Sequence, residues 1–199
     1  MTSQTSQSTD ASPQLPRLPN WRAGVAGENI FSPEECAKII DLCGEMKPGH
    51  VTGVQQDQDH RKCQVDWLGI DKPEHQWIFQ RAMDVVKQVN ATTYRMDLVG
   101  FTERLQVTRY DEGHFQDWHM DFGPGRFSIR KLTFTIQLSD QQDYEGGELE
   151  ILANPDPFAF PKSQGAMILF PTYVVHRVKP VIRGTRFSLV GWIGGPHIR

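Results

Sequence analysis

The second half of the chain is a series of short segments rich in β-branched, aromatic and leucine side chains, and this series most constrains the fold. Connections rich in glycine, proline and aspartate separate the segments, and no helical periodicity intervenes. Many short strands without helices between them are typical of a sandwich or barrel. We therefore expect a double-stranded β-helix, or jelly roll. The expected strand segments are Leu98–Tyr110, Lys131–Leu138, Glu148–Leu152, Ala166–Phe170, Val174–Val178 and Arg186–Ile193.

Helices are expected ahead of these strands. Ser32-Pro33-Glu34-Glu35 has the residues of a helix start, with serine as N-cap, proline at the first helical position and glutamate at the third. Pro73 opens a second amphipathic pattern. The sequence thus predicts a mainly β protein with N-terminal helices: helical support over about 29–91 and a cupin-like β core over about 98–195.

The chain is expected to form one domain over residues 21–199. Residues 1–20 form a Ser/Thr/Gln/Pro tract that is predicted to be a disordered tail, because it has too few apolar side chains to offset the entropy of ordering. Two long connections, His50–Gln64 and Asn154–Gly165, are candidates for lids over a site. A short strand is expected at Val65–Leu68, directly after the first of them.

Composition excludes several classes of function. The 199 residues carry a net charge of -3, so no basic field argues for nucleic acid. No apolar stretch approaches the roughly 18 residues of a membrane span, and the N-terminus lacks the features of a secretory signal. Cys36, Cys43 and Cys63 are an odd number without a CxxC pair. That usage favours a reducing compartment, the cytoplasm, and the spacing of Cys36 and Cys43 lets both face a core.

Three side chains could together hold a metal ion. His119 and Asp121 are at i and i+2, so on a strand they would point to one face, and His176 could reach them from a facing strand. Two imidazoles and one carboxylate can hold iron(II) on one face and leave the other open. An HxD pair has roughly even odds of occurring by chance in such a chain, so the pair needs support from elsewhere. His114 and Asp117 are ranked as weaker candidates.

The last expected strand adds a candidate anion site. Arg186 and Ser188 lie on one face of it, and Trp192 continues that face. The apolar neighbours of Arg186 predict that the strand is buried, and a buried arginine needs an anionic partner. A guanidinium beside a hydroxyl suits the carboxylate of a small molecule.

These features together resemble the iron(II)/2-oxoglutarate-dependent oxygenase superfamily, in its prolyl 4-hydroxylase-like branch. The similar stretches are Tyr110–Gly113, His119–Asp121, Leu138–Leu149 and Ala166–Trp192, which together span most of the β core. Arg61–Leu68 is similar to a lid-forming region of that branch. The resemblance implies a reaction that consumes O2 and 2-oxoglutarate and releases succinate and CO2, with ascorbate as a candidate reductant.

The resemblance also assigns roles to residues. It implies that His119, Asp121 and His176 are the catalytic iron ligands. It implies that Arg186 binds the distal carboxylate of 2-oxoglutarate, where many relatives use lysine. The remaining co-substrate contacts that it implies are Tyr110, Thr133, Ser188 and Trp192.

The substrate is less well defined than the iron site. Relatives commonly carry tyrosine three residues before the first histidine, whereas this chain has Gln116. Gln116, Arg61 and Arg130 are candidate substrate contacts. Related halogenases lack the acid that Asp121 supplies, so its presence favours hydroxylation. The leading hypothesis is a hydroxylase acting on a prolyl or similar residue of a peptide or protein.

Three alternatives remain open at the level of sequence. The same cofactors could serve a hydroxylase of a free amino acid or other small molecule. A cupin-like module could bind or sense metal without turnover. The same three ligands could also hold zinc in a hydrolase.

Overall fold

The computed structural model describes residues 22–49, 59–152 and 156–197. The expected disordered tail at 1–20 and most of the 50–64 connection lie outside these residues. In the described part of the chain, no helix is long and apolar enough to cross a membrane.

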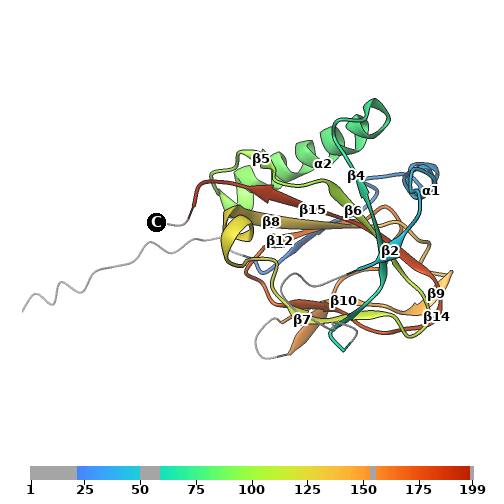
Figure 1. The fold of residues 1–199 in the computed structure, drawn as a ribbon. Helices are drawn as coiled ribbons and strands as arrows, with labels where there is room; N and C mark the ends of the chain where they lie inside the picture. The colour runs from blue at the N-terminus through green and yellow to red at the C-terminus, as the bar shows by residue number, and fades with distance from the viewer. Residues whose placement is uncertain (1–21, 50–58, 153–155, 198–199) are drawn as a thin grey trace, which may run out of the picture.

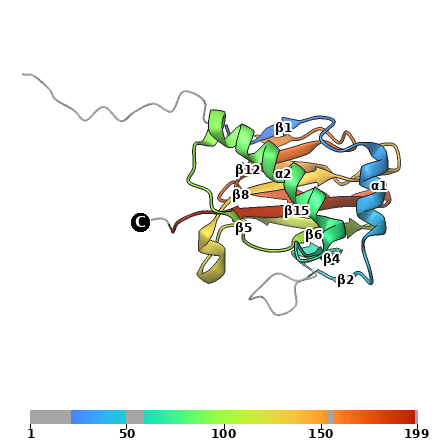
Figure 2. The same cartoon turned by 90° about the horizontal axis from the view of Figure 1, so that it is seen from above.

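Two antiparallel sheets lie face to face, and helices cover the outer face of the larger one (Figures 1 and 2). Within the described residues, the larger sheet has the order β1-β12-β8-β15-β6-β4-β2, with β5 paired to β15. Its strands are β1 (Val25–Gly27), β2 (Lys47–Pro48), β4 (Gln64–Leu68), β5 (Gly100–Phe101), β6 (Leu105–Tyr110), β8 (Arg130–Gln137), β12 (Met167–Pro171) and β15 (Arg186–Gly194).

The smaller sheet has the order β11-β10-β13-β7-β3, and β14 and β9 form a separate pair. Its strands are β3 (Arg61–Lys62), β7 (Phe115–His119), β10 (Leu149–Leu152), β11 (Pro157–Ala159) and β13 (His176–Val178), and the separate pair is β9 (Tyr144–Gly146) with β14 (Val181–Gly184). This arrangement confirms the expected mainly β fold with a jelly-roll core.

Both expected helices are present. α1 (Pro33–Asp41) begins with the predicted capping box, in which the Ser32 hydroxyl accepts from the Glu35 amide and the Glu35 carboxylate accepts from the Ser32 amide. The second helix differs slightly from its prediction: Pro73–His75 forms a 3-10 turn, and α2 runs from Gln76 to Val89. Tight turns of this kind are frequent at helix starts. A π-helical turn, Asn90–Tyr94, follows α2.

The two faces of the larger sheet differ in chemistry. Alternate residues of β6, β8 and β15 form one apolar core with buried side chains of α1 and α2. The residues between them are buried and largely polar, and they face the space between the sheets. The polar set on β6 and β8 is Gln106, Thr108, Thr133, Thr135 and Gln137.

The strand predictions were right for the longer segments and wrong for several connections. Parts of the two expected long connections are strands, β3 within His50–Gln64 and β11 within Asn154–Gly165, and β9 lies between the expected strand segments Lys131–Leu138 and Glu148–Leu152. These two- and three-residue strands form because longer neighbours offer them backbone partners, which their own composition does not reveal. Cys36 is buried as expected, whereas Cys43 is only partly buried against the same core.

Candidate metal and co-substrate site

His119 and His176 face each other across one strand pair. His119 ends β7, His176 begins β13, and the two residues are direct cross-strand partners in the smaller sheet. His176 therefore arrives from the neighbouring strand, not from a facing strand as the sequence had led us to expect. A directly opposed antiparallel pair brings side chains close, and the two imidazole centroids are 4.1 Å apart.

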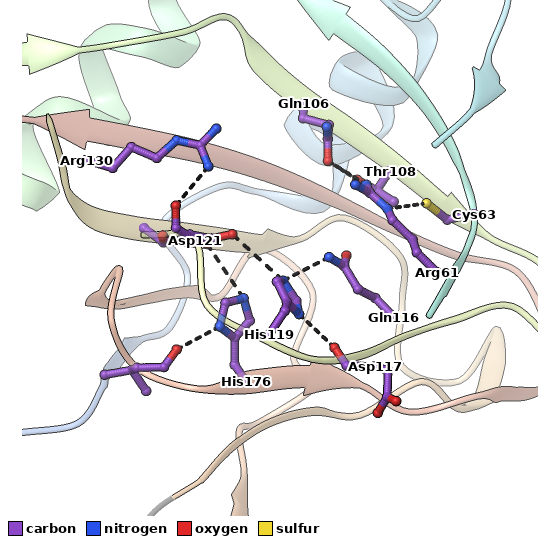
Figure 3. A network of polar contacts seen from close by, with 12 residues as sticks. Arg61, Cys63, Gln106, Thr108, Gln116, Asp117, His119, Asp121, Arg130 and His176 are labelled. Atoms are coloured by element: carbon purple, nitrogen blue, oxygen red, sulfur yellow. Dashed lines mark hydrogen bonds and ion pairs between the residues drawn. The ribbon is translucent and has the colours of Figure 1, made fainter. Parts of the chain in front are cut away.

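Asp121 completes the cluster from beyond the end of β7. Asp121 lies beside His119 as expected, but not for the expected reason. The two residues do not share a strand face, because β7 ends at His119. Backbone bonds place the residue instead: the amides of Asp121 and Phe122 both donate to the Thr172 carbonyl at 3.0 Å. Its carboxylate oxygens lie 3.8 Å from His119 Nε2 and 3.6 Å from His176 Nε2 (Figure 3).

The cluster has the properties of a metal site. Among the described residues, one group of three or more potential ligands has its donor atoms within 4.8 Å of one another, and it is His119, Asp121 and His176. Each histidine Nδ1 contacts a backbone carbonyl, of Asp117 at 2.7 Å and of Val174 at 3.0 Å. A carbonyl only accepts, so each Nδ1 carries the proton and each Nε2 presents a lone pair to the centre.

The electrostatics of the cluster favour the metal-binding forms of its side chains. Burial, together with the nearby His176, lowers the pKa of His119 to about 4, so its ring is neutral at neutral pH. Burial acts to raise the pKa of Asp121, but the two histidines and the Thr133 hydroxyl outweigh it and hold that pKa below its usual range. The Thr133 hydroxyl donates to Asp121 Oδ2 at 2.7 Å. Neutral imidazoles and an ionised carboxylate are the states that bind a divalent ion.

Arg186 lies in the same cavity, on β15. It has no exposed surface, which confirms the expectation that its strand is buried. Nη2 donates to Gln137 Oε1 at 2.8 Å and Nη1 to Ser188 Oγ at 3.3 Å, while Nε has no hydrogen-bond partner among the described residues. Its guanidinium carbon is 5.3 Å from the Tyr110 ring centroid. A buried guanidinium with an unused donor is suited to a carboxylate ligand.

Strand register brings the remaining expected co-substrate contacts together. Arg186 is paired with Tyr110 on β6, and Trp192 is paired with Thr133 on β8. Gly147, in the Leu138–Leu149 stretch, lies beside Arg186. Gly147 has a φ of +64°, and a Cβ there would lie 3.0 Å from Arg186 Cδ, so a side chain would crowd the arginine.

One cavity of about 450 Å³ joins the metal cluster to Arg186. This volume is in the range of small-molecule sites. The lining includes every site residue that the sequence predicted: the metal cluster, the five co-substrate residues Arg186, Tyr110, Thr133, Ser188 and Trp192, and the three candidate substrate contacts Gln116, Arg61 and Arg130.

The three candidate substrate contacts are engaged with the protein. Arg61 donates to Cys63 Sγ at 3.0 Å and to Gln106 Oε1 at 2.9 Å. Arg130 pairs with Glu103, lies between the Phe127 and Trp192 rings, and donates to the Asp121 carbonyl at 3.1 Å. Gln116 contacts His119 (Figure 3).

Sequence reasoning missed Gln137 and Gln106. Gln137 bonds the Arg186 guanidinium, and Gln106 bonds that of Arg61. The signal that could have found them is the alternation of polar and apolar residues in β6 and β8, because the apolar face packs under the helices and leaves the polar face in the cavity.

Comparison with known proteins agrees with this geometry. Residues 105–194 match the family model of the 2OG-Fe(II) oxygenase superfamily. A PKHD-type hydroxylase of Idiomarina loihiensis is 33% identical over 90 residues, which are 45% of this chain and 41% of that protein. Another, from Rippkaea orientalis, is 26% identical over 170 residues, 82% of this chain and 75% of that one. The chain thus spans less than half of the first of these relatives.

Solved structures are similar in fold. A Pseudomonas putida prolyl-4-hydroxylase has a TM-score of 0.70 at 20% identity, over 87% of this chain and 93% of that one. A prolyl hydroxylase from Trichoplax adhaerens, in complex with a peptide fragment of a hypoxia-inducible factor, also has a TM-score of 0.70, at 17% identity. It is matched over 86% of this chain and 83% of that chain.

Proposed function

We propose that the protein is an Fe(II)- and 2-oxoglutarate-dependent dioxygenase, because residues 105–194 match the family model of the 2OG-Fe(II) oxygenase superfamily. Its substrate in this proposal is a prolyl or similar residue of a peptide or protein. One observation carries the proposal: a two-histidine, one-carboxylate cluster and a fully buried arginine share one cavity. The donor set fits iron(II), because it leaves coordination positions open for the co-substrate and oxygen.

The bound metal and co-substrate supply the oxidation: 2-oxoglutarate and O2 become succinate and CO2 as one C–H bond of the substrate becomes C–OH. His119, Asp121 and His176 hold the ion. Arg186 would bind the distal carboxylate, for which its unpartnered Nε is available. Gln137 and Ser188 fix the orientation of the guanidinium before the co-substrate arrives.

Two tryptophan side chains form part of the wall of the cavity. The Trp67 and Trp192 ring centroids are 6.1 Å apart, and the Arg130 guanidinium is stacked 4.1 Å from the Trp192 ring. Such a wall excludes water and packs against an apolar ring such as that of a prolyl residue. The names of the similar hydroxylases support the same substrate class.

The test measures succinate from purified protein with Fe(II), 2-oxoglutarate and pools of prolyl peptides or free amino acids. We expect succinate release that prolyl peptides stimulate and that falls to background in His176→Ala. His197→Ala is the matched control, because His197 is exposed and does not line the cavity. Full turnover in His176→Ala would contradict the proposal. Stimulation by free amino acids alone would reject the peptide substrate but keep the chemistry.

A further inference from the structure

The Gln116 side chain contacts the Tyr110 hydroxyl and the nitrogen of His119 that faces the metal cluster. Figure 3 shows the contact with His119. Its Nε2 is 2.8 Å from His119 Nε2, and its Oε1 is 3.4 Å from the Tyr110 hydroxyl. Gln116 is fixed on β7, where it is paired with Arg61 of β3 and Val178 of β13. Its amide can therefore move only by side-chain rotation.

The surrounding groups determine which way the amide points. His119 Nδ1 donates to the Asp117 carbonyl at 2.7 Å, so Nε2 is the unprotonated nitrogen and can only accept. The Gln116 NH2 group must then be the donor at this contact. Its oxygen faces the Tyr110 hydroxyl, which donates to it. Turning the amide over would place its oxygen against the lone pair of His119, which is unfavourable.

The lone pair that accepts from Gln116 is the one that a metal ion needs. A single imidazole lone pair cannot both accept a hydrogen bond and coordinate an ion. We propose that Gln116 is a positioning residue that caps His119 in the metal-free protein and is displaced when the ion binds. This inference rests on the proposed function, because it takes His119 as a metal ligand.

The hydrogen bond from Gln116 opposes metal binding at His119. The same side chain connects the metal cluster with the part of the cavity that holds Tyr110 and Arg186. Metal binding breaks one neutral hydrogen bond at His119, which weakens binding by about two- to twelvefold on the usual scale of such bonds. The amide also contacts Tyr110, whose ring lies beside Arg186. Displacement of Gln116 therefore changes the surroundings of the tyrosine at the co-substrate end of the cavity.

The test compares Mn(II) affinities of metal-free protein by titration calorimetry. Gln116→Met keeps an unbranched chain and removes the amide, so it should bind Mn(II) about two- to twelvefold more tightly than wild type. Gln88→Met, on the exposed face of α2, is the matched control and should bind as wild type does. Equal or weaker binding by Gln116→Met overturns the inference. Wild type that binds no Mn(II) overturns the proposed function itself.

A second measurement needs no variant. In 15N-labelled wild type, Zn(II) is a diamagnetic probe, and the Gln116 side-chain amide can be assigned through its own backbone resonances. We expect this amide signal and the His119 Nε2 signal to shift together as Zn(II) is added. An amide signal that stays in place while His119 Nε2 shifts would overturn the inference.

Discussion

Thr133 fixes Asp121 through a single hydrogen bond of 2.7 Å. Thr133→Val keeps the shape of the side chain and leaves Asp121 Oδ2 without this donor, so the carboxylate is less well oriented and less stabilised as an anion. We expect the affinity for Mn(II) to fall about ten- to a hundredfold, as is usual when a partner of a metal ligand is lost. Titration calorimetry measures the affinity, and circular dichroism checks that the variant folds.

The chain offers a closely matched control. Thr185 Oγ1 donates to Asp111 Oδ1 at 3.0 Å, and neither residue lines the cavity. Thr185→Val removes the same kind of bond elsewhere, so it should leave Mn(II) affinity unchanged. If both variants lose affinity equally, the effect of Thr133→Val comes from general loosening and not from Asp121.

Among single residues, the sequence revealed those with distinctive chemistry and missed the residues that hydrogen-bond to them. Histidine, aspartate and a buried arginine indicate a site, because imidazole and carboxylate groups bind metal ions and a buried guanidinium binds anions. Glutamine has no such signature, and Gln137 reaches Arg186 across 49 positions of sequence, through adjacent strands. The contact between Gln116 and His119 also depends on the tautomer of the histidine, which the Asp117 carbonyl determines.

Among the helices and strands, α1 has an N-cap whose contribution to stability can be tested separately from the site. Ser32→Ala removes the hydroxyl that accepts from the Glu35 amide, while Glu35 also pairs with Arg81 of α2. We expect the free energy of unfolding to fall by about 1 kcal/mol, the usual cost of losing such a cap. Urea denaturation followed by circular dichroism measures it.

Ser32→Asp is the control for this change, because aspartate caps helices about as well as serine. It should keep most of the stability that Ser32→Ala loses. Mn(II) affinity should be unchanged in both variants, since α1 lies on the outer face of the larger sheet (Figure 2). Equal loss of stability in the two variants would show that the cap is not the cause.

The prediction of strands succeeded for segments whose own sequence pattern is typical of a strand. β6, β8, β12 and β15 have five to nine residues with strong alternation or apolar runs, and each lies within or close to its expected segment. The expected strand segments did not include β7, although the metal-site prediction assumed that His119 lies on a strand, because the sequence of β7 is polar and aromatic without clear alternation. Its pairing with β13 and β3 determines its conformation, and such long-range pairing cannot be read from a local window.

Over the whole molecule, one sheet separates two environments. The outer face of the larger sheet is apolar and packs under α1 and α2, whereas its inner face holds buried glutamines, threonines and Arg186. The helices thus stabilise the sheet from one side, and its other side can remain polar for the site. The charge composition did not reveal this division, because the polar face is mostly uncharged.

Burial of thiol and phenol groups makes the stability of the protein depend on pH in the alkaline range. Burial raises the pKa of the Cys36 and Cys43 thiols to about 11, and it raises the pKa of the Tyr94, Tyr110 and Tyr144 phenols. In the unfolded chain these groups have ordinary pKa values of 9.0 and 10.0 and lose their protons first. A folded pKa above the unfolded one means that stability is fully present below the unfolded value and is lost as pH rises.

The free energy of unfolding should therefore be level from neutral pH to about pH 9 and fall between pH 9 and 11, as the pKa values of the two thiols require. Each group that is ionised only in the unfolded chain contributes at most about 1.4 kcal/mol per pH unit. Urea denaturation of metal-free, reduced protein across this range measures the slope. The double variant Cys36→Ala, Cys43→Ala should show a shallower slope than wild type, whatever its stability at neutral pH. A free energy of unfolding that stays level to pH 11 in wild type would contradict the prediction, because burial would then not be holding the protons on these groups.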